Sequence, residues 1–346
     1  MGVTPPRDDS WSVEAFTPED RRRVIDALRY VGRDLHHRSF SVSSDRRELL
    51  WQEMDACLQL ADQLSASPSR QPALNRVSDP AARPCTLITG ASSGIGAALA
   101  VSFAHRSEVL VLVARRGDRL ESQAMALQER FGLRVLPMAL DLNAPQAVDQ
   151  LLARLAAQGL WVETLVNNAG FGLRGTFEAS SWDQQDGMLQ LMVRVPTQLT
   201  RQLLPEMQRR GQGCILNVAS LAGLIPGLPG STLYSAVKAY LIRFSQSLAA
   251  ENAGSGIRVM ALCPGYVHTE FHAVLGVEER MQRLPGLFWL TVDQLVQWTE
   301  RGLKGSRVVL VPGRVNRVIA ALAQYLPLRW ANALSAAFSR RFRSRP

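Results

Sequence analysis

The sequence predicts an α/β protein built on a doubly wound, seven-stranded parallel sheet, with a helical appendage before it. From residue 85 onward, short runs rich in Val, Leu and Ile alternate with amphipathic helical stretches, which is the order of elements in α/β domains. The apolar runs are continuous, as expected of strands that helices cover on both faces. The predicted strands are 85–89, 109–114, 134–140, 162–167, 214–219, 257–263 and 307–311.

Residues 1–64 are predicted to form two amphipathic helices. A Thr-Pro-Glu-Asp helix start at 17–20 and a Ser-Asp pair at 44–45 each precede apolar residues at helical spacing. Helices this short need a surface to pack on, either each other or the main domain. Residues 65–84 hold four prolines and are typical of a linker. We therefore expect an appendage (1–64), a linker (65–84), a main domain (85–313) and a C-terminal extension (314–346).

The positive charge is concentrated at the C-terminal end. The 346 residues carry a formal net charge of +9. Residues 301–346 contain nine Arg, one Lys and no acidic residue, so this segment is +10 and residues 1–300 are close to neutral. A protein that binds nucleic acid over its main domain would need a basic face there. We therefore expect no nucleic-acid partner.

The cysteines and the start of the chain favour a cytoplasmic protein. Cys57, Cys85, Cys214 and Cys263 show no metal-ligand spacing and are predicted to be reduced, mostly buried thiols. The chain begins with polar and charged residues rather than with the apolar segment of a signal peptide. No apolar run approaches the roughly 18 residues that a membrane-spanning helix needs.

A glycine-rich turn follows the first predicted strand and opens a helix. It consists of Thr89-Gly90-Ala91-Ser92-Ser93-Gly94-Ile95-Gly96. Glycines let the backbone approach a pyrophosphate closely, and the N–H groups at a helix N-terminus bind its negative charge. A tight turn without a ligand is the alternative. The strand before the turn and the helix after it favour a dinucleotide site.

With this glycine spacing and four further motifs in order, the sequence resembles the short-chain dehydrogenase/reductase superfamily. The further motifs are Asn167-Asn168-Ala169-Gly170 after the fourth strand, Ser220 after the fifth, Tyr234 with Lys238, and Pro264-Gly265 after the sixth. The resemblance covers about residues 85–313 and implies a Rossmann-type oxidoreductase that interconverts a carbonyl and an alcohol with NAD(P). The cofactor-binding residues that it implies are Thr89, Gly90, Ser92, Ser93, Gly94, Ile95, Gly96, Asn168, Ala169, Gly170, Tyr234, Lys238, Pro264 and Gly265.

Tyr234 and Lys238 are predicted to lie on one face of a helix, because residues four apart are neighbours there. A cation beside a phenol favours the phenolate and lowers the tyrosine pKa from its usual value of about 10, which suits proton transfer. Packing of the tyrosine ring against the lysine stem is the alternative for this pair alone. The resemblance implies that Tyr234 is the general acid/base, that Lys238 holds the nicotinamide ribose, and that the Ser220 hydroxyl stabilises the substrate oxygen.

One position departs from the family pattern. The family usually has an asparagine on the helix after the fourth strand, which connects the lysine to solvent through water, and Met192 stands there. A methionine cannot support a water relay as an amide does. Either Met192 packs in the core and water reaches Lys238 by another route, or the protein binds cofactor with little or no turnover, as a regulatory or scaffold protein. The intact Ser220, Tyr234 and Lys238 favour an enzyme.

Two arginines after the second strand favour NADP(H), with NAD(H) as the second choice. A chain that selects NAD usually has an acidic residue about 20 positions beyond the glycines, where it bonds the ribose hydroxyls. This chain has Arg115 and Arg116. Arg115, alone or together with Arg116, would pair with a 2′-phosphate, and two solvated arginines at a helix start are the alternative. Asp141, after the third strand, matches the family position that contacts adenine.

The segment after Pro264-Gly265 corresponds to the substrate lid of the family. Its apolar residues at 266–271 and 284–290, together with those at 221–228, predict an apolar pocket mouth. A lipophilic ketone, ketoacyl or steroid-like compound is therefore the expected substrate, while apolar packing that only closes the lid is the alternative. His268 and His272 have no third ligand in the sequence pattern, so we expect no metal.

The basic end is predicted to be helical and amphipathic. Apolar residues fall on one helical face at 315–322, and aromatic and leucine side chains recur every four residues from Trp330 to Phe342. With its arginines, segment 328–346 is typical of a helix that lies on an anionic membrane surface. The alternative is a helix packed on the main domain or on another subunit of the homo-oligomer, dimer or tetramer, that we expect.

Overall fold

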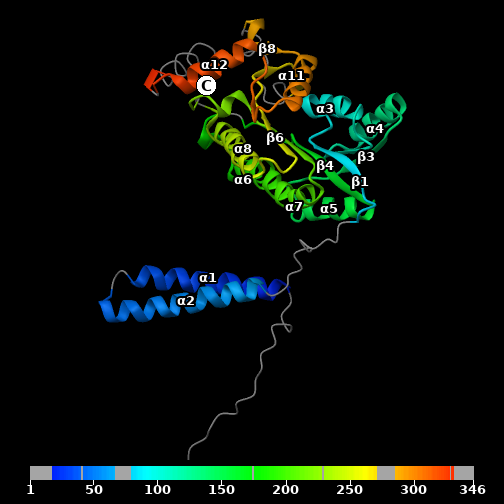
Figure 1. Ribbon diagram of the computed structural model, residues 1–346. Helices are drawn as coiled ribbons and strands as arrows, with labels where there is room; N and C mark the ends of the chain where they lie inside the picture. The colour runs from blue at the N-terminus through cyan, green and yellow to red at the C-terminus, as the bar shows by residue number, and fades with distance from the viewer. Residues whose placement is uncertain are drawn as a thin grey trace, which may run out of the picture. The chain divides into compact units, whose positions relative to one another are not determined.

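The computed structural model describes residues 18–39, 42–66, 79–173, 175–227, 230–270, 285–327 and 329–330. The chain divides into two compact units, residues 1–77 and 78–346. In the first unit, α1 (Pro18–Ser39) and α2 (Ser44–Ala66) lie side by side (Figure 1). Leu35 and Ala61 are buried between them, and the Trp51 indole N–H donates to the Ser39 hydroxyl at 3.1 Å. The two helices therefore use each other as their packing surface.

The second unit is built on a seven-stranded parallel sheet in the order β3-β2-β1-β4-β5-β6-β9. The predicted doubly wound sheet is confirmed, and the order reverses direction between β1 and β4. Ligands of such sheets bind outside the carboxyl ends of the strands at this reversal. The strands are β1 (Arg83–Thr89), β2 (Val109–Ala114), β3 (Arg134–Ala139), β4 (Leu160–Asn167), β5 (Gly213–Val218), β6 (Ile257–Leu262) and β9 (Val309–Leu310).

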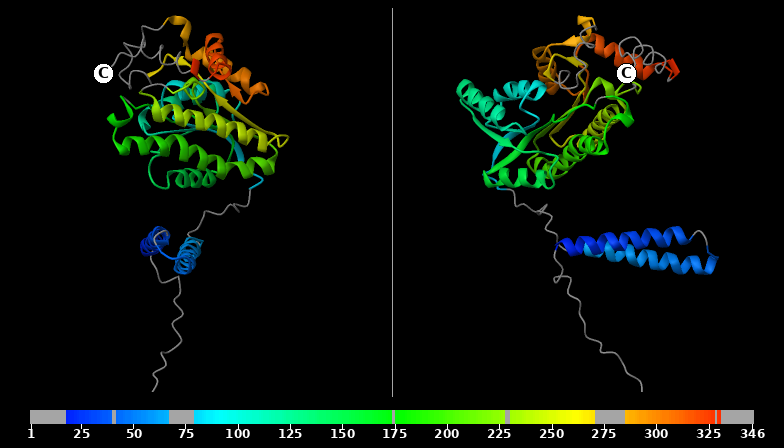
Figure 2. Two further views of the ribbon diagram at one scale, coloured as in Figure 1. Left: turned by 90° about the vertical axis from the view of Figure 1, so that its left-hand side faces the viewer. Right: turned by 180° about the vertical axis from the view of Figure 1, so that it is seen from behind.

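Helices cover both faces of the sheet (Figure 2). One core contains side chains of α5, α7 and α8, and the other contains side chains of α3, α4 and α11. Strand β2 shows why both faces are apolar, since Val109, Val111 and Val113 enter the first core while Leu110 and Leu112 enter the second. The helices are α3 (Gly94–Ala104), α4 (Gly117–Phe131), α5 (Ala147–Ala157), α6 (Trp182–Leu189), α7 (Val195–Arg210), α8 (Thr232–Glu251), α11 (Val292–Lys304) and α12 (Arg314–Tyr325).

The last strand is shorter than the sequence predicts. The expected strand covers 307–311, whereas β9 contains only Val309–Leu310. In its hydrogen bonds to β6, the Ala261 N–H donates to the Val308 carbonyl and the Cys263 N–H donates to the Leu310 carbonyl. The pairing of β9 with β6 is therefore limited to this short segment. The sequence analysis also missed the small sheet of β7 (Tyr266–Val267) and β8 (Trp289–Leu290).

Two predicted features of the C-terminal half lie partly or wholly outside the described residues. Helix α12 contains the predicted apolar positions 315–322, and its Asn316 and Ala320 are buried against the unit. Of the predicted membrane-surface helix 328–346, only residues 329–330 are described, and residues 271–284 of the predicted lid are not described. Among the described helices, none is long and apolar enough to cross a membrane.

Candidate active site

The predicted motifs come together at the carboxyl ends of β1, β4, β5 and β6, because all of these strands run parallel. The glycine turn follows β1, the Asn-Asn-Ala-Gly motif begins at the end of β4, Ser220 lies two residues beyond β5, and Pro264 lies two residues beyond β6. Tyr234 and Lys238 enter from α8. One edge of the sheet therefore holds every predicted motif that bears chemistry.

The glycines of the turn are required by its geometry. Gly90 and Gly94 have positive φ angles of 65° and 54°, which residues with a Cβ rarely adopt. Gly96 has a different reason, because a Cβ there would overlap the Gly90 carbonyl oxygen and the Asn168 side chain. The turn and the first residues of α3 are thus held close to the end of β4.

Asn168 joins the two motifs. Its amide Nδ2 donates to the carbonyls of Thr89 and Gly90, both at 3.0 Å. In return, the Thr89 hydroxyl oxygen accepts from the backbone N–H groups of Asn168 and Ala169 at 3.0 and 3.1 Å. The predicted role of Asn168 at the cofactor is therefore accompanied by a structural role, since its side chain positions the glycine turn.

Ser220, Tyr234 and Lys238 form one group. The Ser220 side chain hydrogen-bonds the Tyr234 side chain and also accepts from the Ala222 N–H at 3.1 Å. The Lys238 ammonium lies 5.6 Å from the centroid of the Tyr234 ring and donates to the Val218 carbonyl at 2.7 Å. The predicted sharing of one helix face is confirmed by this contact.

Burial governs the protonation of this group. It raises the pKa of Tyr234 to about 12, against a smaller lowering by the hydrogen bond from Ser220. It also lowers the pKa of Lys238 to about 8, against a smaller raising by the neighbouring Cys263 thiol. The expectation that the tyrosine pKa lies below its usual value is wrong for the protein without cofactor, because burial disfavours the charged phenolate.

Met192 is a core residue. It is buried, packs with Met188 and Val237, and belongs to a π-helical turn at Gln190–Arg194 between α6 and α7. A Cβ on Gly170 would lie 3.1 Å from the Met192 methyl carbon. The methionine therefore fills the space behind the Asn-Asn-Ala-Gly motif with apolar atoms, as the packing alternative predicts.

A small hollow lies beside Tyr234. Its volume is about 20 Å³, and it is lined by α6, the start of α8 and the loop before α6. Gln185 supports that loop by donating to the Phe177 carbonyl at 2.7 Å and to the Ser180 hydroxyl at 2.9 Å. No sequence motif predicted these residues, although the Ser181 capping box marks the start of α6.

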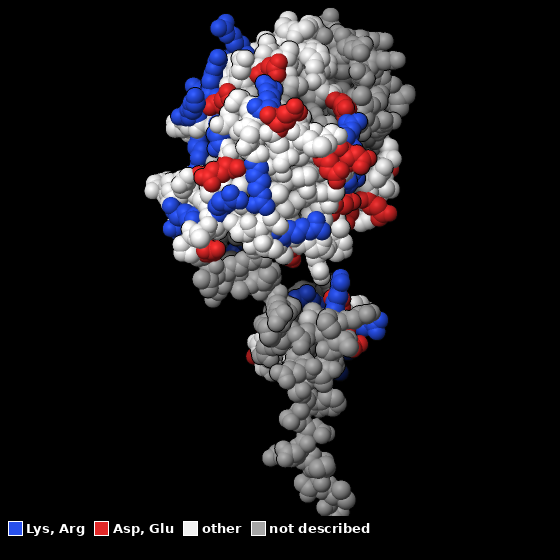
Figure 3. All heavy atoms as spheres, turned by 90° about the vertical axis from the view of Figure 1, so that its right-hand side faces the viewer, with Lys and Arg blue, Asp and Glu red and all other residues white. Residues whose placement is uncertain are grey.

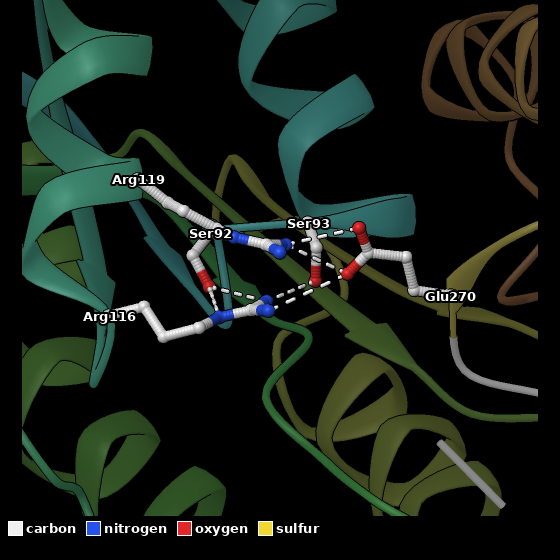
Figure 4. Close-up of polar contacts among 5 residues, drawn as sticks. All are labelled: Ser92, Ser93, Arg116, Arg119 and Glu270. Carbon is white, nitrogen blue, oxygen red and sulfur yellow. Dashed lines mark hydrogen bonds and ion pairs between the residues drawn. The ribbon is translucent and has the colours of Figure 1, made fainter. Parts of the chain in front are cut away.

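The two predicted arginines differ in their contacts, and Figure 4 shows those of Arg116. Arg116 donates to the Ser92 hydroxyl at 3.1 Å and to the Ser93 hydroxyl at 2.6 Å, so it lies against the glycine turn. Arg115 is exposed, and its role stays a prediction. Asp141 is also exposed, and its carboxylate accepts from the Asn143 N–H at 3.0 Å, which stabilises the turn after β3.

Arg116 belongs to a cluster with Glu270 and Arg119, two residues that the sequence did not predict at the site. Glu270 forms ion pairs with Arg116 at 3.5 Å and with Arg119 at 2.9 Å (Figure 4). The two arginines lower the Glu270 pKa, Arg119 through its hydrogen bond most strongly. No local pattern marks this pairing, because Arg119 and Glu270 are 151 residues apart.

Pro264 and Gly265 fix the other side of the site. The Pro264 carbonyl accepts from the Leu221 N–H at 2.8 Å, and a Cβ on Gly265 would lie 2.5 Å from Asn316 Oδ1. Gly265 therefore allows α12 to approach.

Among the described residues, no group of three or more His, Cys, Asp or Glu side chains could hold a metal ion. His268 stacks on Trp289, with ring centroids 4.5 Å apart.

The chain matches a known protein family. The family model described as short chain dehydrogenase matches residues 84–279, more than half of the chain. The chain belongs to the short-chain dehydrogenase family. It is an oxidoreductase of this family, which interconverts alcohols and carbonyls with a nicotinamide cofactor.

Curated relatives of this dehydrogenase match its main domain. A sulfoacetaldehyde reductase of Chromohalobacter salexigens is 40% identical over 193 residues, which are 55% of this chain and 75% of the relative. An NADP-dependent 3-hydroxy acid dehydrogenase of Schizosaccharomyces pombe is 35% identical over 191 residues, which are 54% of this chain and 73% of the relative.

Solved structures resemble the dehydrogenase over most of its length. A short-chain dehydrogenase from Sphingobium yanoikuyae in complex with NADPH has a TM-score of 0.61 and 31% identity, and the match covers 76% of this chain and 96% of that one. A bulky-bulky ketone specific alcohol dehydrogenase from Comamonas testosteroni has a TM-score of 0.58 and 29% identity over the same shares, 76% and 96%.

Proposed function

We propose that the protein is an NADP(H)-dependent oxidoreductase in which Tyr234 transfers the proton between solvent and the substrate oxygen. The observation that carries the proposal is the contact of Tyr234 with both Ser220 and Lys238 at the sheet edge that also holds the glycine turn. A tyrosine that merely packed on a lysine would need neither the serine nor the turn beside it.

The glycine turn fits a dinucleotide. Gly90 and Gly94 keep the backbone open in conformations that side chains would strain. Ser93, at the N-cap of α3, makes no capping hydrogen bond, and its hydroxyl accepts from Arg116 instead. The first amides of α3 are therefore not covered by the cap side chain, and such amides bind a pyrophosphate.

A preference for NADP(H) is supported by the basic residues beside this turn. Arg116 presents a guanidinium, which suits a 2′-phosphate, where an NAD-selective chain would have an acid. One curated relative is named NADP-dependent, and one structural neighbour was solved with NADPH.

The chain's own groups are arranged for proton transfer. When bound, the nicotinamide supplies or accepts the hydride. The Ser220 and Tyr234 side chains hydrogen-bond each other, and in this proposal both hydroxyls donate to the substrate oxygen. With a pKa of about 12, Tyr234 is protonated at neutral pH and is ready to donate as a carbonyl is reduced. Lys238 then stabilises the phenolate that remains.

We propose a lipophilic substrate of the ketone, ketoacyl or steroid-like kind. Leu173, Phe177 and Leu233 line the hollow beside Tyr234, together with hydroxyl and amide side chains that would orient a polar end. The structural neighbour specific for bulky ketones supports the same class. A cofactor-binding scaffold without turnover is the alternative, and its one argument is that Met192 replaces the asparagine that is usual in the family.

The test is NADPH oxidation with a panel of lipophilic ketones and ketoacyl compounds, measured for wild type, Tyr234→Phe and Tyr240→Phe. Tyr240 lies on the same helix and bonds Thr197 at 2.6 Å, so it is a matched control. We expect Tyr234→Phe to lose about 10³-fold in kcat and the control to retain activity. If wild type is inert while NADPH still binds, the scaffold alternative replaces the enzyme.

We further propose that the protein forms a homo-oligomer. Trp182 is a large apolar side chain exposed on the described surface, and exposed apolar surface is a common mark of an interface between subunits. Sedimentation equilibrium should give at least twice the 38.1 kDa mass of one chain. A monomer at micromolar concentration would contradict the proposal.

A peripheral membrane contact through the basic end is also proposed. On the face drawn in Figure 3, acidic and basic side chains are intermixed, so that face offers an anionic partner no continuous basic surface. In contrast, Val318, Leu322 and Tyr325 of α12 and the following Trp330 are exposed, and arginines flank them. Flotation with anionic liposomes should recover the full chain but lose it after deletion of 328–346, and equal recovery would contradict the contact.

A further inference from the structure

Glu270 lies in a cluster with two arginines that come from a distant part of the chain. Arg119 Nη1 donates to both carboxylate oxygens, at 3.1 and 2.9 Å, and Arg116 Nη1 lies 3.5 Å from Oε2 (Figure 4). The arginines stand at the start of α4, whereas Glu270 follows β7. The carboxylate thus holds two guanidiniums together.

The cluster lies over the glycine turn. Arg116 is fixed there by the hydroxyls of Ser92 and Ser93. The residue before Glu270 also touches the turn, since a Cβ on Gly94 would lie 3.4 Å from Thr269 Cβ. Two independent contacts therefore place the Glu270 carboxylate beside the residues that would receive the adenosine half of a dinucleotide.

The cluster has an excess of positive charge that favours binding of a more highly charged anion. Two guanidiniums face one carboxylate, so the cluster keeps a net charge of +1. All three side chains are about half exposed, between 46% and 54%. Ion pairs at such exposure are weak and screened by water, and a phosphate that carries up to two charges forms stronger pairs with the same guanidinium forks.

We propose that Glu270 is an internal anion that occupies the 2′-phosphate subsite in the absence of cofactor, and that Arg119 is the second guanidinium of that subsite. The inference rests on the proposed use of NADP(H). The 2′-phosphate displaces the carboxylate from Arg116 and Arg119, and binding of NADP(H) therefore includes the cost of breaking these pairs. NAD(H), which has no 2′-phosphate, leaves the pairs in place.

The experiment is calorimetric titration of the full chain with NADPH, NADH and 2′,5′-ADP. The variants are Glu270→Gln, Arg119→Gln and a matched control, Glu129→Gln, which removes one exposed negative charge at the far end of α4. For Glu270→Gln we expect NADPH and 2′,5′-ADP to bind about fivefold more tightly, as exposed ion pairs imply, with NADH within twofold of wild type. Arg119→Gln should weaken NADPH and 2′,5′-ADP about fivefold and leave NADH unchanged.

The outcomes separate this inference from the proposed function. If wild type binds NADPH and 2′,5′-ADP, and Glu270→Gln binds them equally or more weakly, Glu270 is not a competitor and the inference is overturned while the use of NADP(H) stands. If neither wild type nor Glu270→Gln binds 2′,5′-ADP or NADPH, both proposals fail together. Tighter binding by Glu129→Gln to the same extent would assign the effect to net charge and also overturn the inference.

Discussion

The two charged centres at the sheet edge are controlled by opposite physical effects. Lys238 is buried and Tyr234 is half-buried, and burial shifts both of their pKa values in the direction that favours the neutral forms. Glu270 and its arginines are half exposed, and their mutual attraction lowers the pKa of the carboxyl. Desolvation therefore sets the protonation of the buried centre, whereas the exposed centre depends on ion pairs that a ligand can replace.

The largest effect is expected from Lys238→Met, which removes the charge of the buried centre. Activity should fall about 10³-fold because the phenolate loses its cation. The free energy of unfolding at pH 7 should rise by about 2 kcal/mol, because a buried ammonium costs more than its hydrogen bond to Val218 returns. Urea unfolding measures this, and a less stable variant would contradict the role of burial.

Burial of Lys238 should also make the free energy of unfolding depend on pH. Between pH 8 and about 10 the unfolded chain keeps the Lys238 proton that the folded protein has released. The unfolded state then binds more protons, so the free energy of unfolding contributed by Lys238 increases with pH in this window. Lys238→Met should lack this increase, and an unchanged profile would show that Lys238 is not desolvated.

A smaller effect is expected from Gly96→Ala, which disturbs the turn between the two centres. The new Cβ would overlap the Gly90 carbonyl and the Asn168 side chain, and overpacking of this kind costs about 1–3 kcal/mol. Thermal unfolding and NADPH titration should both show the loss. Gly286→Ala is the control, since a Cβ there meets nothing within 4 Å, and equal losses in both variants would contradict the overlap.

Arg116→Gln and Arg115→Gln together test the exposed centre. Because Arg116 lies against the serines of the turn and Arg115 does not, we expect about tenfold weaker NADPH binding for the first and less than about threefold for the second. NADH affinity should change little in either variant. A larger loss of NADPH affinity in Arg115→Gln than in Arg116→Gln would instead identify Arg115 as the main contact of the 2′-phosphate.

The smallest effect is expected from salt. Raising the ionic strength from about 0.05 to 0.5 M screens exposed charges but hardly affects buried ones. The Kd of NADPH should therefore rise about threefold, while kcat at saturating cofactor stays constant. A fall in kcat with an unchanged Kd would contradict the assignment of cofactor binding to the exposed charges and of proton transfer to the buried ones.

Much of the fold was predictable because it depends on neighbours in the sequence. Continuous apolar runs marked the seven strands, and only the edge strand β9 was clearly shorter than expected. The spacing of four residues between Tyr234 and Lys238 determined their common helix face, and the glycine order determined the turn. In each case the relevant contacts are set by the local geometry of a helix, a strand or a turn.

Only the tertiary structure decided how these elements modify one another. It brought Glu270 to Arg119 across 151 residues and Asn316 to Gly265, and it placed Tyr234 where burial raises the tyrosine pKa. The physical reason is that sheet order and burial depend on the whole chain. The sequence by itself therefore determined which chemical groups are present and their spacing, and the packing determined their partners and protonation.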